Sequence, residues 1–106
     1  WLAVEQGEEV QIDMTDAPDS TTGAIYNEQA PDQEKRDAAL NPPGEWNTFE
    51  IVVADNTITV FLNGVKINEW VNDDPNVDLT RGYIGIQNHG SGDDVSFRNI
   101  RIKELP

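Results

Sequence analysis

The amino-acid sequence predicts an all-β fold, an antiparallel β-sandwich or jelly roll of six or seven strands with one short helix near residues 32–40. Three observations predict it: apolar and polar residues alternate along most of the chain, turn formers separate the alternating segments, and only one segment has a helical composition. With 106 residues the chain is long enough for one domain with its own core. We therefore expect a single β-sandwich domain over residues 1–106.

The first alternating segment is EEVQIDM, residues 8–14. Its apolar residues share one face of an extended chain and its polar residues share the other. The apolar set is Val10, Ile12 and Met14, and the polar set is Glu9, Gln11 and Asp13. This pattern predicts a half-buried strand with its apolar face toward the core.

Residues 46–70 predict a three-stranded antiparallel meander. Asn63-Gly64 favours a type I′ turn, which needs positive φ at both central residues, and Asp55-Asn56 is expected to make a similar tight turn. Trp46 begins the first strand and is expected to join the core. The residues expected to point inward are Phe49, Ile51, Val53, Ile58, Val60 and Leu62.

Two segments lack the alternation. The helix expected over residues 32–40 ends at Asn41 and the Pro42-Pro43-Gly44 stop, because proline cannot continue a helix. The other segment, NDDPNVDLTRG at residues 72–82, is rich in turn formers and predicts a loop.

The segment GYIGIQNHGSGDDVSFRNIRI, residues 82–102, predicts two strands joined by a glycine-rich turn that contains His89, the one histidine of the chain. Val95 and Phe97 occupy odd positions, whereas Ile100 and Ile102 occupy even ones. A bulge or twist near residues 98–99 is therefore needed to bury both pairs on one face.

Composition narrows the classes of function. The chain has 20 acidic and 7 basic residues, a formal net charge of −13, which disfavours nucleic acid and anionic membranes as partners. No apolar run approaches the ~18 residues of a membrane span, and with no cysteine there is neither a disulfide nor a thiolate site. The charge is typical of a soluble protein in a salty or extracellular setting.

Several segments together resemble the 3-keto-disaccharide hydrolase family, formerly a domain of unknown function. They are EEVQID, TGAIYN, PPGEWNTFEIVV, NTITVFLNGVKIN and GYIGIQNHGSGDDVSFRNIRIKEL, in this order and spacing. The resemblance implies a concanavalin A-like lectin/glucanase jelly roll of two antiparallel sheets. It also implies a carbohydrate ligand and a secreted, periplasmic or extracellular location.

The chain is shorter than typical members of that family, which have further strands before the EEVQID segment. It therefore resembles the C-terminal part of the domain, and we expect an incomplete sandwich with open sheet edges. Those edges would be covered by an N-terminal segment, by a second copy of the chain, or by closure of the remaining strands into a smaller sandwich.

The polar face of residues 9–13 is the first candidate site. It is similar to the E-x-D-x-E strand of jelly-roll glucanases, but the Cα atoms of Glu9 and Asp13 are roughly 13 Å apart on a regular strand. Paired glycosidase carboxyls are about 5–5.5 or 6.5–9.5 Å apart, which argues against an ordinary glycosidase pair. A 3-keto sugar needs only one base and one donor for the enolate oxygen, so Glu9 and His89 are the candidate catalytic residues. The competing interpretation is an ordinary solvated strand face.

The candidate sugar-binding residues come from three segments. Gln87 and His89 share a face by parity, and QNHG matches the glutamine and His-Gly of the family pattern. Tyr26 offers an aromatic ring beside the amide of Asn27, although a core position for Tyr26 is equally compatible with the sequence. A structural or merely solvated role for His89 also stays open. The full substrate-binding set is Gln11, Asp13, Tyr26, Asn27, Gln87 and Asn88.

No metal or cofactor is expected. The GSGDD turn lacks the spacing of a calcium loop, and the chain has no P-loop, nucleophile elbow or dinucleotide fingerprint. Three functions stay open: a 3-keto-glycoside hydrolase or lyase, a lectin-like binding module without turnover, and an assembly protein that pairs through open sheet edges.

Overall fold

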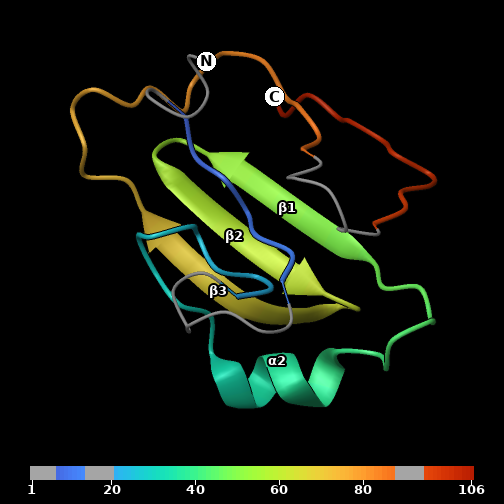
Figure 1. The fold of residues 1–106 in the computed structure, drawn as a ribbon. Coiled ribbons are helices and arrows are strands. Elements are labelled where there is room, and N and C mark those ends of the chain that lie inside the picture. The colour runs from blue at the N-terminus through green and yellow to red at the C-terminus, as the bar shows by residue number, and fades with distance from the viewer. Residues whose placement is uncertain (1–6, 14–20, 88–94) are drawn as a thin grey trace.

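A computed structural model of the chain describes residues 7–13, 21–87 and 95–106. Its regular elements are helix α2 (Gln33–Ala39) and the strands β1 (Phe49–Ala54), β2 (Thr57–Leu62) and β3 (Val65–Val71) (Figure 1). The strands form one antiparallel sheet in the order β1-β2-β3. The described residues thus form an incomplete all-β fold with one short helix, and they contain fewer strands than the six or seven expected.

The meander predicted over residues 46–70 is confirmed. β1 and β2 pair in register from Phe49 opposite Leu62 to Ala54 opposite Thr57. Asn63 and Gly64 have φ angles of 50° and 85°, as the type I′ turn between β2 and β3 requires. Asp55, in the other tight turn, has a φ of 55°.

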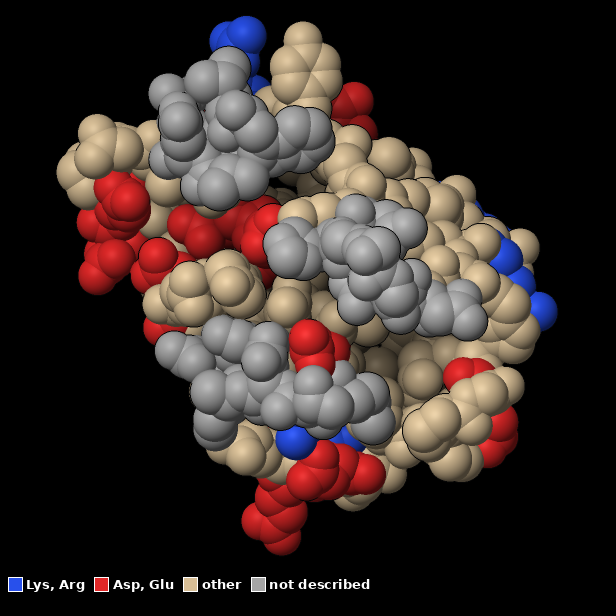
Figure 2. All heavy atoms as spheres, viewed as in Figure 1, with Lys and Arg blue, Asp and Glu red and all other residues tan. Residues whose placement is uncertain are grey.

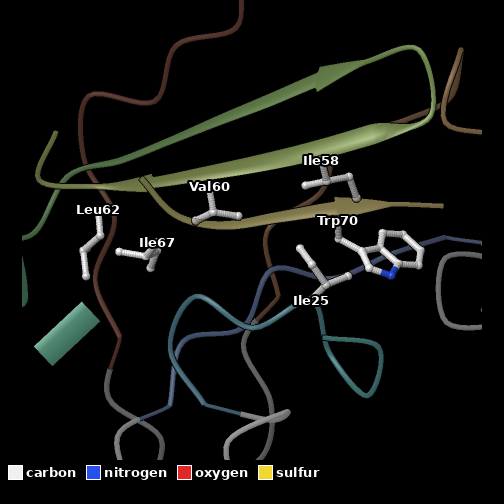
Figure 3. Close-up of a cluster of buried hydrophobic side chains, with 6 residues drawn as sticks. All are labelled: Ile25, Ile58, Val60, Leu62, Ile67 and Trp70. Carbon is white, nitrogen blue, oxygen red and sulfur yellow. The ribbon is translucent and has the colours of Figure 1, made fainter. Parts of the chain in front are cut away.

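The core lies on one face of this sheet (Figure 3). The alternation of β2 directs its branched residues to this face, and Ile25 packs against them from a loop in front of the sheet. A bulge between Val60 and Phe61 adds a residue to β3, which allows Ile67 to be buried as well. The buried cluster consists of Ile25, Ile58, Val60, Leu62, Ile67 and Trp70.

β1 contributes less to the core than its pattern predicts. Ile51 and Val53 lie opposite Val60 and Ile58, and directly paired residues of an antiparallel sheet share a face. The predicted parity is therefore confirmed. However, Ile51 is 46% and Val53 is 43% exposed, because no described segment covers this part of the face.

Helix α2 is confirmed within one residue of its expected bounds. Asp32 caps it by accepting from the Lys35 N–H at 3.0 Å, and the Asp32 N–H donates to the Ile67 carbonyl at 2.7 Å. These two bonds fix the start of the helix against β3. Across the described residues, no helix has the length and apolar character that a membrane span needs.

The strand predicted at residues 8–14 is wrong for the described residues 8–13. Only Val10 forms a bridge, to Ile25, and Ile12 is exposed instead of pointing to the core. A regular ladder fails because the opposing chain turns at Gly23, with a φ of 86°. Val10 packs against the core as expected.

The two strands predicted in residues 82–102 are wrong for the described residues 82–87 and 95–102. These residues form no strand, and no described residue beyond position 80 makes a hydrogen bond within the described chain. Asn99 has a left-handed φ of 53°, at the position where the parity of the apolar residues changes. Trp46 is also outside the expected core: it is exposed, and the Arg98 guanidinium lies 4.0 Å above its ring.

Candidate functional site

The segment with Glu9 and Gln11 runs across the front of the sheet and pairs with residues 23–26 (Figure 1). The Tyr26 N–H donates to the Glu9 carbonyl at 3.0 Å. Gln11 donates its N–H to the Ala24 carbonyl at 3.0 Å and accepts from the Gly23 N–H at 2.9 Å. The structure therefore brings Glu9 and Gln11 beside the loop that carries Tyr26 and Asn27.

That loop is a tight turn with its two candidate residues at the tip. Ile25 and Gln29 close it through a pair of backbone bonds of 2.9 and 3.0 Å. Asn27 adopts a φ of 60°, a left-handed conformation that asparagine tolerates better than most residues. Both Tyr26 and Asn27 are exposed, so Tyr26 is not a core residue and its ring is open to a ligand.

The buried side chain of Asn68 holds this loop in place. Its amide nitrogen donates to the Gly23 carbonyl at 3.0 Å and to the Gln29 carbonyl at 3.2 Å, while its oxygen accepts from the Gln29 amide at 2.8 Å. Sequence reasoning missed Asn68. A signal was present, since a polar residue between Ile67 and Trp70 in a buried strand needs partners to satisfy its amide.

Gly23 allows the loop to approach β3 closely. A Cβ atom at this position would collide with the Cδ1 of Ile67, and the φ of 86° is one that other residues rarely adopt. The course of the TGAIYN segment therefore depends on Gly23, because any larger residue would require the backbone or Ile67 to move.

Asp13 is at the other end of the N-terminal segment. Its carbonyl accepts from the Thr21 hydroxyl at 2.8 Å and from the Thr22 N–H at 2.8 Å. Arg36 of α2 donates to the same Thr21 hydroxyl at 2.7 Å. This network anchors the segment to α2, and it does not bring Asp13 to the loop tip with Tyr26.

Of the described carboxyls, Glu8 has the most strongly shifted pKa, and sequence reasoning missed it. Burial raises the pKa of Glu8 to about 7, and the negative charges of Glu28, Asp74 and Glu9 add to the effect. These acids come from three segments that are far apart in the sequence. Their closeness could therefore not be predicted from the order of residues along the chain. Figure 2 shows Asp and Glu side chains around a hollow on the side of this face where β3 ends.

Two open hollows lie beside β3 and the loop that follows it. One, of about 450 Å³, is lined by Asn56 and residues 72–75, 77 and 78, and the other, of about 230 Å³, lies between α2 and β3. In the loop after β3, the hydroxyl and N–H of Thr80 donate to Asp78 and lower its pKa. Within the described ranges, no three His, Asp or Glu side chains converge as metal ligands would.

The remaining candidates are not joined to this site. Gln87 is exposed and makes no hydrogen bond to another described residue. Asn88 and His89 lie outside the described residues. The prediction that Gln87 and His89 face the same surface as Glu9 therefore stays a prediction.

Comparison with known proteins gives one match. A family model described as the 3-keto-alpha-glucoside-1,2-lyase-like domain matches residues 1–103. No curated protein and no solved structure matches the chain.

Proposed function

Because the chain belongs to the 3-keto-alpha-glucoside-1,2-lyase-like family, a carbohydrate-active family, we propose that it cleaves the glycosidic bond of a 3-keto sugar by elimination. The match over residues 1–103 is the observation that carries this proposal. The arrangement of carboxyl, amide and aromatic groups around the loop at residues 25–29 supports it.

The proposed reaction uses the acidity that a C3 ketone gives to the neighbouring C2 proton. A base takes that proton, and the electron pair is held as an enolate whose oxygen needs a hydrogen-bond donor. The enolate then forms a C1–C2 double bond while the C1–O bond breaks, and the leaving oxygen takes up a proton. Addition of water across the double bond makes the net reaction a hydrolysis.

We assign the base to Glu8 in preference to Glu9. A general base works best when its pKa lies near the working pH, and the pKa of Glu8 is raised to about 7. Glu28, which contributes to that rise, is in the same loop as Tyr26 and Asn27. The proposed base and the sugar-binding groups would therefore meet at this loop.

The other polar groups have positioning roles in this proposal. Tyr26 covers a C–H face of the sugar, and Asn27 and Gln11 take its hydroxyl groups. Gln87, Asn88 and His89 are proposed from the sequence pattern alone, with His89 as the donor to the enolate oxygen or as a second base. Asp13 is the least supported of the set, because its backbone is bound at the α2 end.

Incubation with a 3-keto-glucoside, followed by proton NMR, tests this proposal. We expect loss of the C2 proton signal with release of the aglycone, and the Glu8→Gln variant should be slower by about 10²-fold or more. Glu28→Gln should keep the reaction but move its pH profile to lower pH, because one of the charges that raise the Glu8 pKa is removed.

Glu45→Gln is the matched control, since Glu45 is an exposed glutamate outside this group and its loss should leave the rate unchanged. Unchanged substrate with the wild-type protein would remove the enzyme proposal. Saturable sugar binding without turnover would instead identify a lectin-like module. A larger reduction of the reaction rate in Glu9→Gln than in Glu8→Gln would assign the base role to Glu9.

We also propose that the protein works outside the cytoplasm. The family resemblance and the net charge of −13 support this location. Detection of the native protein only in the cytoplasmic fraction of its cell would contradict it.

A further inference from the structure

The face of the sheet opposite the buried cluster is a separate surface, which we call the outer face. β2 alternates between buried residues and partly exposed ones, and the partly exposed set lies on the outer face. Directly paired residues of an antiparallel sheet share a face, so the partners of this set in β1 and β3 point the same way. The members from β1 and β2 are Glu50, Val52, Ala54, Thr57, Thr59 and Phe61. β3 adds Lys66, Glu69 and Val71.

No described segment buries the outer face. The loop with Ile25 lies on the other side of the sheet, against the core (Figure 3). The described residues 81–87 and 95–106 are all exposed, so they form no packed layer over the sheet. Val71 is 62% exposed, and Phe61 and Val52 are partly exposed. A sheet face with an aromatic ring and branched side chains is suited to packing against a second sheet.

One row of the outer face has opposite charges at its two ends. Glu50 of β1 is paired with Phe61 of β2, and Phe61 is paired with Lys66 of β3. Among the described residues Glu50 makes no ion pair, while Lys66 donates to Glu69 at 2.8 Å with both side chains about half exposed. An ammonium group has three donors, so Lys66 can bind a second carboxylate. The row therefore reads acid, aromatic ring, base from one edge of the sheet to the other.

This row is complementary to a reversed copy of itself. A two-fold axis between two outer faces, parallel to β2, places β1 of each copy over β3 of the other. Glu50 of each copy then meets Lys66 of the other, and the two Phe61 rings meet near the axis. An axis perpendicular to the strands would instead place Glu50 over Ala54 and Lys66 over Val71, which leaves both charges without a partner. The charges therefore favour the first arrangement.

The net charge of −13 opposes the association of two copies, but the outer face itself is nearly balanced. It has two acids, Glu50 and Glu69, and one base, Lys66. At an ionic strength of about 0.15 M, charges more than about 8 Å apart are largely screened. Repulsion between the remaining acids of the two copies is then weak, whereas the pairs in contact across the interface persist.

We propose that two copies of the chain associate through their outer faces, with β1 of each copy over β3 of the other. Three strands of about six residues present a face of roughly 300 Å², below the ~800 Å² per partner of a stable interface. The dimer is therefore weak, with a dissociation constant of about 10 µM to 1 mM. The loop at residues 25–29 lies on the core side of the sheet, so the proposed sugar site stays open in the dimer. The dimer does not depend on the proposed reaction.

Sedimentation equilibrium of the full chain, from about 10 µM to 1 mM at about 0.15 M salt, tests this proposal. The average mass of the wild type should rise from monomer toward dimer over this range. Glu50→Lys and Lys66→Glu each place like charges opposite one another and should weaken the dimer about tenfold or more. The double variant with both substitutions exchanges the two signs and should restore the dimer. An equimolar mixture of the two single variants should form a heterodimer for the same reason.

The matched controls are Glu45→Lys and Lys35→Glu, which make the same charge changes at exposed residues outside the outer face and should leave the dimer unchanged. Glu50 and Lys66 are themselves exposed, so all variants should fold, which circular dichroism checks. Any of four results would overturn the proposal: a monomeric wild type at about 1 mM, single variants that associate like the wild type, a folded double variant that stays monomeric, or an equal loss in the controls. The first of these would leave the outer face to a different protein or to a carbohydrate.

Discussion

β2 and the C-terminal segment contain the same kinds of residue in opposite environments. Leu62 of β2 is fully buried, whereas Ile102, in a similar alternation, is 70% exposed. β2 has a hydrogen-bonded neighbour on each side and a layer of loops over its apolar face. The described residues 95–106 have neither.

The difference shows what turns an alternating pattern into a strand. Alternation makes one face apolar, but the backbone groups of a strand still need a partner strand, and the apolar face needs a cover. β1 is intermediate: it has one partner, correct parity and a half-exposed face. Stability should therefore be unevenly distributed along the chain.

The largest expected effect compares the two regions directly. Leu62→Ala should lower the free energy of unfolding by about 3 kcal/mol, because it leaves a cavity in the buried cluster. Ile102→Ala should change it by less than about 0.5 kcal/mol, since Ile102 is exposed. Urea unfolding of both variants measures the contrast, and similar losses would show that the C-terminal residues are packed in solution.

Asn68→Leu should have the next largest effect. It leaves the Gly23 carbonyl without its donor in a buried site and removes one of the two donors to the Gln29 carbonyl, at a cost of about 2 kcal/mol. The amide chemical shifts of Tyr26 and Asn27 should also change, because the loop loses its attachment to β3. Asn76→Leu, at an exposed asparagine, is the control and should leave both the stability and these shifts unchanged.

Glu8→Gln should alter the pH dependence of stability. The folded protein holds the Glu8 proton up to a pKa of about 7, whereas the unfolded chain releases it near 4.5, so wild-type stability falls as pH rises between these values. After allowance for solvent screening, the fall is about 1–2 kcal/mol. The variant should lack this component, and unfolding midpoints at pH 4 and pH 8 compare the two proteins. A wild-type stability that rises across this interval would contradict the assignment.

The smallest expected effect concerns the contact between the two regions. Arg98→Ala removes the cation above Trp46, with a loss of about 0.5–1 kcal/mol at most and a shift in tryptophan emission. Arg101→Ala removes the same charge without this contact and should leave the emission unchanged. An unchanged spectrum in Arg98→Ala would show that the two side chains do not meet in solution.

The sequence predicted the parts of the fold that depend on neighbouring residues. The meander, its Asn63-Gly64 turn and the short helix are all determined by local chemistry. Parity also placed Ile51 and Val53 on the correct face, but it could not show that this face lacks a cover. Ile100 and Ile102 form no strand, because a strand needs a partner edge, which local alternation does not reveal.

The candidate site was predictable to a similar degree. Spacing and family resemblance led to Glu9, Gln11, Tyr26 and Asn27. The backbone bonds of Glu9 and Gln11 place their segment beside the loop with Tyr26 and Asn27, and the roles of these residues stay predictions. Glu8 was missed because the acids that raise its pKa come from distant positions. The pKa of a carboxyl therefore depended on long-range neighbours, whereas the position of a hydrogen-bonded loop was largely a local property.

The Asn63-Gly64 turn has a further consequence, for the chemical lifetime of the protein. An asparagine before glycine is prone to deamidation, because the following backbone nitrogen easily attacks the side-chain amide. Here the Asn63 amide is occupied: it donates to the Ala39 carbonyl and to Asn47, each at 2.8 Å, and its oxygen accepts from the Thr48 N–H at 2.8 Å. A carboxylate at this position would be unable to donate to either acceptor. The hydrogen bonds that connect the turn to α2 and to the residues just before β1 should therefore also slow deamidation of Asn63 for as long as the protein stays folded.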